Sequence, residues 1–212
     1  MMKKAFAAAV FAAMTMSAQA GVLISEGFDD VAGLAASGWT FLNASEPAGT
    51  TGSWFQGSSN IFDAQAGAST SYAAANFRNA GPGGTISSWL FTPTFDASGG
   101  VDISFYLRAA GEGYADQVSF GFTNEGATMT TINPVPDSGW TLYSVHLDAN
   151  TLGTTGFAFY YSGTYDTANY VGLDSLNIST PTATGDVPEP ASLALLAGGL
   201  LGLGAMRRRA RR

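Results

Sequence analysis

The sequence predicts an all-β protein, an antiparallel β-sandwich of jelly-roll type, flanked by two hydrophobic ends. Three observations predict this class. Apolar residues alternate with period two between Gly21 and Thr180, and no long stretch has the 3.6-residue period of an amphipathic helix. The alternating runs are short, and loops separate them, one of which is rich in Ser, Ala, Gly and Gln. Nine or ten such strands fit two packed sheets.

The strongest strand predictions are runs in which every second residue is apolar, so that one face points inward. Weaker runs begin at Val22, Gly38, Gly52, Ser71 and Thr85, and the Gly81-Pro82-Gly83-Gly84 segment before Thr85 is predicted to be a turn. The strongest runs are 101–107, 118–122, 143–147, 157–161 and 170–178.

The N-terminal hydrophobic end has the pattern of a secretory signal peptide. Lys3 and Lys4 precede the apolar stretch 5–16, and Ala18 and Ala20 form a small-residue cleavage site before Gly21. The apolar stretch is too short for a membrane span. We therefore expect residues 1–20 to be a helical signal peptide that directs the chain to the Sec machinery and is removed by signal peptidase, so that the mature protein begins at Gly21.

The C-terminal hydrophobic end, residues 187–212, has three parts in a fixed order. Val187-Pro188-Glu189-Pro190 precedes sixteen uncharged residues, 191–206, which would rise about 24 Å as a helix, slightly less than the bilayer core. The prolines prevent the helix from extending upstream. Five arginines follow, which are costly to translocate and should stay cytoplasmic: Arg207, Arg208, Arg209, Arg211 and Arg212.

These three parts together resemble the PEP-CTERM protein-sorting signal of Gram-negative bacteria. The resemblance implies that an exosortase, a membrane transpeptidase-like protease, recognises the segment around Pro188-Glu189-Pro190 and processes the chain nearby. It also implies transient membrane anchoring through the tail, followed by delivery to the cell surface or the extracellular polysaccharide matrix.

The segment between the two ends is strongly acidic and free of cysteine. From Gly21 to Asp186, two basic residues, Arg78 and Arg108, stand against fifteen Asp and Glu, a net charge of −13. Such a surface repels nucleic acid and attracts divalent cations, although solubility alone would also explain it. Without disulfides, the exported domain must be stabilised by its core or by bound metal. Residues 21–180 suffice for one domain, and the Thr- and Pro-rich residues 181–186 read as a linker.

Six short motifs occur in the order typical of one domain family. They are Glu26-Gly27-Phe28-Asp29, Gly38-Trp39, Gly52-Ser53-Trp54-Phe55, Trp89-Leu90-Phe91-Thr92-Pro93, Asp102-Ile103-Ser104-Phe105-Tyr106 and Val171-Gly172-Leu173-Asp174-Ser175-Leu176. Together they resemble the choice-of-anchor J domain, which is related to cleaved-adhesin and MAM-type jelly rolls. The resemblance implies a surface-anchored architecture without an established catalytic activity. The ending departs from the family, because relatives commonly carry two adjacent acids there.

Carboxylates are the main chemical resource of the domain. Glu26, Asp29 and Asp30 end the first predicted strand, and Asp174 lies in the last one. If these strands are neighbours, the four side chains could converge on a structural Ca²⁺ ion, which the jelly-roll relatives also suggest. Solvated surface acids are the alternative interpretation.

An enzyme is not predicted, and no catalytic residue is assigned. The single histidine, His146, reads as a solvated strand residue, and no G-x-S-x-G motif is present. A paired-carboxylate glycan hydrolase is a third-ranked alternative, with Glu112, Asp116 and Glu125 read as solvated loop acids. The leading prediction is a structural or adhesive domain. The second is a carbohydrate-binding module, with Trp54 and Trp140 as exposed contacts for an extracellular polysaccharide and Trp89 in the core.

Overall fold

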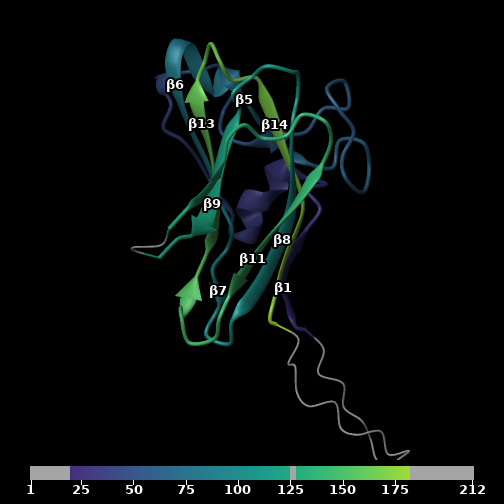
Figure 1. The fold of residues 1–212 in the computed structure, drawn as a ribbon, viewed down its shortest axis with the longest axis vertical. Coiled ribbons are helices and arrows are strands. Elements are labelled where there is room, and N and C mark those ends of the chain that lie inside the picture. Colours follow the sequence, from purple (N-terminus) through teal and green to yellow (C-terminus); the bar gives the residue numbers. More distant parts are fainter. Residues whose placement is uncertain (1–19, 125–127, 182–212) are drawn as a thin grey trace, which may run out of the picture. The chain divides into compact units, whose positions relative to one another are not determined.

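The computed structural model describes residues 20–124 and 128–181, which fold into a sandwich of two antiparallel sheets (Figure 1). This architecture confirms the predicted fold class. Both predicted terminal helices, the signal peptide, the linker from residue 182 and the sorting tail lie outside the described residues. Within the described ranges, no helix is long and apolar enough to cross a bilayer.

The first sheet is built around its longest central strand, β14 (Tyr170–Ser179). On one side β14 pairs with β8 (Val101–Ala109), which pairs with β11 (Thr141–Leu147). On the other side its first half pairs with β5 (Ala73–Asn76) and its second half with β1 (Val22–Glu26). The short strand β4 (Phe55–Gln56) extends the sheet beyond β5.

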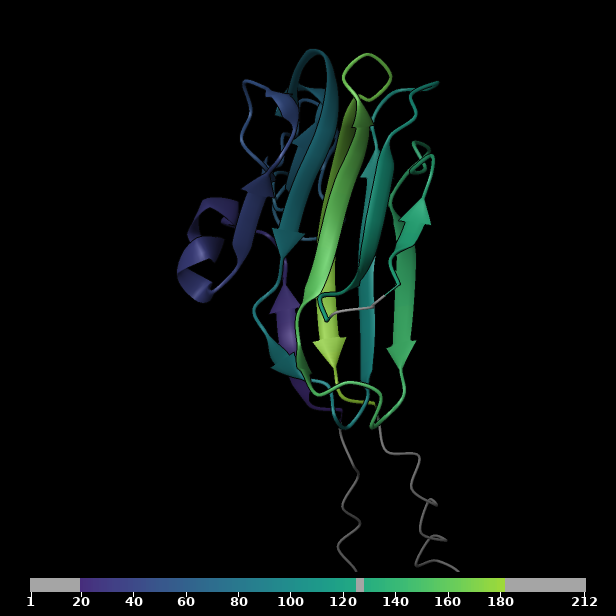
Figure 2. The same cartoon turned by 90° about the vertical axis from the view of Figure 1, so that its left-hand side faces the viewer.

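The second sheet has the order β10 (Thr130–Ile132), β9 (Gln117–Phe122), β13 (Phe157–Thr164), β6 (Ala80–Phe91) and β2 (Thr40–Asn43). Figure 2 looks onto the outer face of this sheet. The strand β3 (Glu46–Ala48) also pairs with β6, and β7 (Phe95–Asp96) and β12 (Thr154–Thr155) form a separate ribbon. Two 3₁₀ helices complete the described elements: η1 (Val31–Ser37) and η2 (Phe77–Asn79).

The prediction of a turn at residues 81–84 was wrong, because these residues lie within β6. Their glycines permit close packing instead. A Cβ at Gly84 would lie 2.6 Å from the Glu46 carbonyl oxygen, and one at Gly81 would lie 2.9 Å from Pro47. The absent side chains let β3 approach β6 closely.

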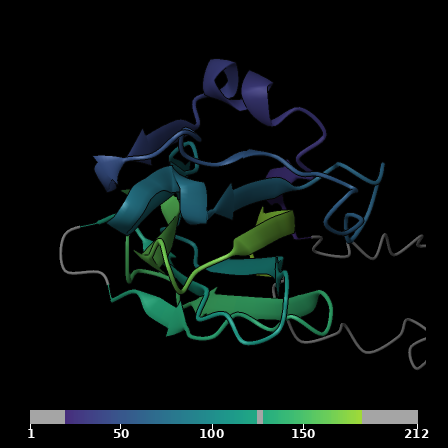
Figure 3. The same ribbon diagram turned by 90° about the horizontal axis from the view of Figure 1, so that it is seen from above.

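The main core lies between the inner faces of the two sheets. Phe105 of β8 lies at its centre, with its ring centroid 4.8 Å from that of Phe120 and 4.9 Å from that of Phe159. Perpendicular aromatic pairs of this kind place a ring edge against a ring face, which the ring quadrupoles favour. Figure 3 shows η1 beside the sandwich, where Val31 and Leu34 are buried against the same core.

A bulge in β14 keeps the apolar side chains on the inner face. Val171 and Leu173 point inward, and the next inward residues are Leu176 and Ile178, three positions later rather than two. The register with β8 shifts between Asp174 and Asn177, and Ser175 has a φ of 52°. The extra residue restores the phase of the alternation.

A second, smaller apolar cluster covers part of the outer face of the first sheet, and we call it the outer cluster. Phe62, from the loop between β4 and β5, stacks on Tyr72 with ring centroids 5.0 Å apart. Trp140 meets the same Phe62 ring edge-on at 5.4 Å, and the Arg108 guanidinium lies 4.5 Å from its centroid. The loop 57–71 is thereby held against the sheet.

Candidate functional site

The two ends of the domain lie side by side. The Thr180 amide donates to the Gly21 carbonyl at 2.8 Å, and the Gly21 amide donates to Thr180 Oγ1 at 2.8 Å. Gly21 is the first residue after the predicted signal cleavage site at Ala18 and Ala20. The predicted signal peptide and the sorting tail are therefore attached to the domain at the same end of the first sheet.

Asp174, a predicted calcium ligand, is completely buried and is satisfied by protein groups. Its Oδ2 accepts hydrogen bonds from the Gln65 amide at 2.7 Å and the Ala66 amide at 3.2 Å. Its Oδ1 accepts from the Ser175 amide at 2.5 Å, a contact that the bulge makes possible. Burial raises the pKa of the Asp174 carboxyl above its ordinary value, and these hydrogen bonds act in the opposite direction. The carboxylate thus fixes the loop 57–71 to β14.

The other three predicted ligands have local partners. Glu26 Oε1 accepts from the Phe28 amide at 2.7 Å, and Asp30 caps η1 by accepting from the Gly33 amide at 3.1 Å. Asp29 Oδ1 accepts from the Ser71 hydroxyl at 2.5 Å. Within residues 20–124 and 128–181, no three His, Cys, Asp or Glu side chains gather where they could hold a metal ion. The structure does not bring the four carboxylates together, and calcium binding stays a prediction.

The predicted exposure of the two tryptophans is corrected by the structure. Trp54 is only 4% exposed and packs in the main core, where its Nε1 donates to the Ser88 carbonyl at 3.4 Å. Trp140 is half-buried in the outer cluster, and its Nε1 donates to the Asp63 carbonyl at 2.9 Å. Burial removes Trp54 as a sugar contact, whereas a glycan contact at the half-buried Trp140 stays a prediction.

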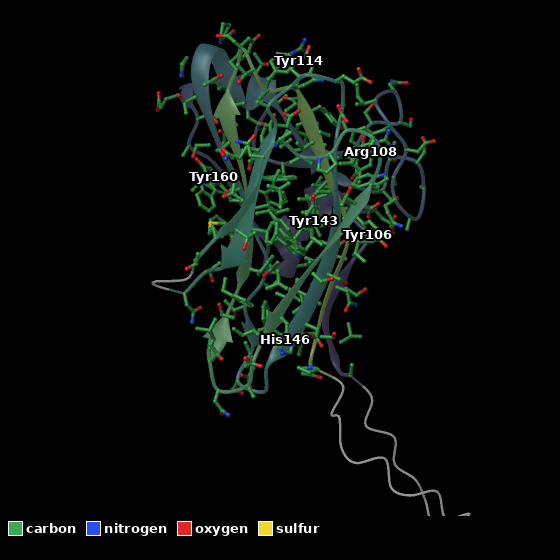
Figure 4. All side chains as sticks on the ribbon, viewed as in Figure 1. Tyr106, Arg108, Tyr114, Tyr143, His146 and Tyr160 are labelled. Atoms are coloured by element: carbon green, nitrogen blue, oxygen red, sulfur yellow. The ribbon has the colours of Figure 1, made fainter. Side chains whose placement is uncertain are left out.

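Trp89, which the sequence placed in the core, instead points outward from the second sheet. Its ring stacks on Tyr160 of β13 with centroids 4.0 Å apart and planes at 18°. It is also parallel to the Phe91 ring, whose centroid is 5.6 Å away. We call these three half-buried rings the aromatic ridge. Figure 4 shows Tyr160 pointing away from the sandwich.

Cross-strand pairing brings the ridge together. Trp89 lies opposite Tyr160 on one side and opposite Leu42 of β2 on the other, and Leu42 is 47% exposed. Directly opposed residues on one sheet face have neighbouring Cβ atoms, so a continuous apolar row forms across β2, β6 and β13. These residues come from three segments that are distant in the sequence. The alternation in β6 was the available sequence signal, because Trp89 and Phe91 are out of phase with the buried Leu90 and should therefore point outward.

Two further titratable groups considered in the sequence are Asp116 and His146, and they lie in different environments. Asp116 is 1% exposed and accepts from the Tyr161 hydroxyl at 2.6 Å, so it is a core residue rather than the solvated loop acid that the sequence suggested. Burial raises the pKa of its carboxyl. His146 is exposed as predicted, with its Nδ1 2.6 Å from Asp102 Oδ1. Glu125 lies outside the described residues.

The comparison with known families identifies the C-terminal tail. The PEP-CTERM protein-sorting motif matches residues 186–209, which contain the predicted processing segment Val187-Pro188-Glu189-Pro190. The motif implies export of the chain and recognition by an exosortase. No curated protein matches the sequence.

Solved structures of cleaved adhesin domains from Lys-gingipain are similar to the sandwich. The K3 domain from Porphyromonas gingivalis W83 matches with a TM-score of 0.53 and 18% identity, over 77% of this chain and 100% of that domain. The K2 domain matches with a TM-score of 0.53 and 21% identity, over 74% and 99% of the respective chains. The K1 domain from P. gingivalis W83 matches with a TM-score of 0.51 and 20% identity, over 74% of this chain and 98% of that domain. This likeness confirms the jelly-roll type of fold and is consistent with the predicted choice-of-anchor J domain.

Proposed function

We propose that this protein is delivered by an exosortase system to the cell surface or the extracellular polysaccharide matrix, where its β-sandwich has a structural or adhesive role. The observation that carries the proposal is the sorting motif at residues 186–209, attached to an acidic, cysteine-free sandwich. Transient anchoring through residues 191–206 and arrest by the terminal arginines belong to the same proposal.

Two features of the sandwich support the second half of the proposal. Three of the solved structures that share its fold are named as cleaved adhesin domains. The two buried carboxylates, Asp116 and Asp174, also make internal hydrogen bonds, which favours a structural role for them over hydrolysis. Carbohydrate binding is the second candidate function, and the aromatic ridge is the observation that favours it.

Replacing Pro188, Glu189 and Pro190 together by alanine tests the sorting step in cells that carry a matching exosortase. We expect the variant to accumulate in the inner membrane with its tail uncleaved, whereas the wild type reaches the surface or medium in a shortened form. Immunoblots of cell fractions and the mass of the released protein measure both. A matched control replaces Thr182 and Thr184 by alanine in the linker and should be sorted normally. Normal sorting of the Pro-Glu-Pro variant would contradict the proposal.

A further inference from the structure

We propose that the aromatic ridge of Trp89, Phe91 and Tyr160 is the contact surface for a neutral polysaccharide chain. This inference rests on the proposed function and deepens it, because it names the class of partner that the sandwich meets in the matrix and the side chains that would bind it.

The first argument is the chemistry of the sheet face around the ridge. Two residues along the strands from Trp89 and Tyr160, an outward row crosses β6, β13 and β9 and consists of Ser87, Ser162 and Gln117. The Ser162 hydroxyl donates to Gln117 Oε1 at 2.9 Å. Beside Tyr160, the hydroxyls of Ser119 and Thr131 are 2.7 Å apart. The face therefore combines apolar rings with neutral hydroxyl and amide groups.

The second argument is the absence of charge on this face. The outward residues of β2, β6, β9 and β13, between the rows of Ser87 and Phe91, include no Asp, Glu, Lys or Arg. The opposite outer face carries Asp102, Arg108 and His146, and the segment from Gly21 to Asp186 has a net charge of −13. This part of the surface therefore lacks the negative charge that the composition of the domain would lead one to expect.

These two properties match a neutral sugar polymer. The C–H faces of a pyranose ring pack against aromatic carbons, while its hydroxyls bond to hydroxyl and amide side chains. An anionic polymer would meet no cation on this face and would be repelled by the net charge. A second copy of this chain would bring the same strong negative charge, so self-association through the ridge is disfavoured.

The geometry also lowers the cost of binding. The Trp89 ring is held between neighbours, with Tyr160 at 4.0 Å and Phe91 at 5.6 Å, and its Nε1 donates to Ser87 Oγ at 3.3 Å. Side chains that are already ordered lose little rotamer freedom when a ligand binds. The ridge spans two strands and is continued by Leu42 on a third, so an extended chain could lie across the sheet.

The test is native affinity electrophoresis of the full chain, purified in a polyoxyethylene detergent so that no glycoside headgroup competes. The gels contain galactomannan, mixed-linkage β-glucan or hydroxyethyl cellulose as neutral probes, and alginate as an anionic probe. We expect retardation by at least one neutral probe and none by alginate. For that probe, Trp89→Ala and Tyr160→Ala should weaken binding by about tenfold or more, because each removes part of the apolar contact surface and the ring that holds its neighbour in place.

Matched variants keep the result interpretable. Trp89→Phe retains a ring and should bind within about threefold of wild type. Tyr106→Ala removes a half-buried, outward tyrosine from β8 on the other sheet and should bind normally. Tyr160→Ala leaves Trp89 in place, so it decides the question if Trp89→Ala does not fold, and thermal melting verifies each variant.

Several outcomes would overturn the inference. They are no retardation of the wild type by any neutral probe, retardation by alginate, full binding by folded Tyr160→Ala, or a concentration-dependent dimer that the ridge substitutions abolish. Sorting is measured separately by cell fractionation of the same variants. Normal sorting without glycan binding defeats only this inference, whereas glycan binding without exosortase-dependent sorting defeats only the proposed function.

Discussion

Asp174 should be among the most sensitive side chains of the domain, because one buried carboxylate joins the loop 57–71 to β14. We consider its replacement by alanine in the full chain. The substitution removes the acceptor of the Gln65, Ala66 and Ser175 amides. A partly buried hydrogen bond that is lost costs about 1 kcal/mol, so the free energy of unfolding should fall by about 3 kcal/mol.

The conservative variant Asp174→Asn should have an intermediate effect. Oδ2 receives two amides and Oδ1 receives one amide and a hydroxyl, and an Asn side chain can accept through one oxygen only. We therefore expect a loss of about 1–2 kcal/mol. The graded series separates the hydrogen bonds from the space that the side chain fills.

Thermal melting followed by circular dichroism measures the series. For a domain of this size, 1 kcal/mol shifts the melting temperature by about 2–4 °C, so Asp174→Ala should melt about 6–12 °C lower. Amide hydrogen exchange should also accelerate at Gln65 and Ala66. The exposed residue Asp148 provides a control, because Asp148→Ala should leave melting unchanged. If Asp174→Ala melted with the wild type and the exchange rates were unaltered, our account of this loop would be refuted.

Three further predictions concern pH, packing and metal. Burial raises the folded-state pKa of Asp116, so this carboxyl contributes its full stability below its unfolded pKa, and the contribution is lost as pH rises through the folded value. Urea unfolding between pH 4 and 7 should therefore show that the free energy of unfolding falls toward neutral pH, and that Asp116→Asn makes this fall smaller. The same pH dependence in wild type and Asp116→Asn would contradict the prediction. Gly57→Ala should destabilise the domain by about 1–3 kcal/mol, because the new Cβ would lie 2.3 Å from a carbon of the buried Tyr72 ring, while Gly52→Ala, where nothing lies within 4 Å, serves as control. If the four carboxylates predicted from the sequence bind calcium, the ion should raise the melting temperature and EDTA should reverse the rise, and indifference to both in calorimetry would remove the site.

The strands of the core could be predicted from the sequence because their inward faces are uniformly apolar. The run 101–107 alternates without interruption, and the structure places Val101, Ile103, Phe105 and Leu107 in the core. The bulge is also visible in the sequence, because the apolar residues of β14 change from odd to even positions after Leu173. Periodicity reports on the buried side of each strand.

The outer surfaces could not be predicted in the same way. In Ser87-Ser88-Trp89-Leu90-Phe91, both phases contain apolar residues, and the phase that points inward includes Ser88. Ser88 is tolerated in the core because its hydroxyl lies 3.0 Å from that of Ser53. The phase of Trp89 relative to Leu90 is a weak signal by itself, and the pairing of β6 with β13 and β2 shows that Trp89 lies outside. The prediction that Trp54 is exposed was wrong because it relied on a nearby glycine-rich turn, and such a turn does not determine whether an indole is buried.

The place of β14 in the sheet has a mechanical consequence. If the domain meets a load in the proposed anchored state, before the tail is processed, tension enters the fold at Ser179 and runs along β14. That strand is bonded to β8 on one flank and to β5 and β1 on the other. The load is then shared in shear by two ladders at once, whereas a strand at the rim of the sheet would peel away bond by bond. Attachment through a central strand therefore favours resistance to mechanical unfolding over attachment through an edge strand.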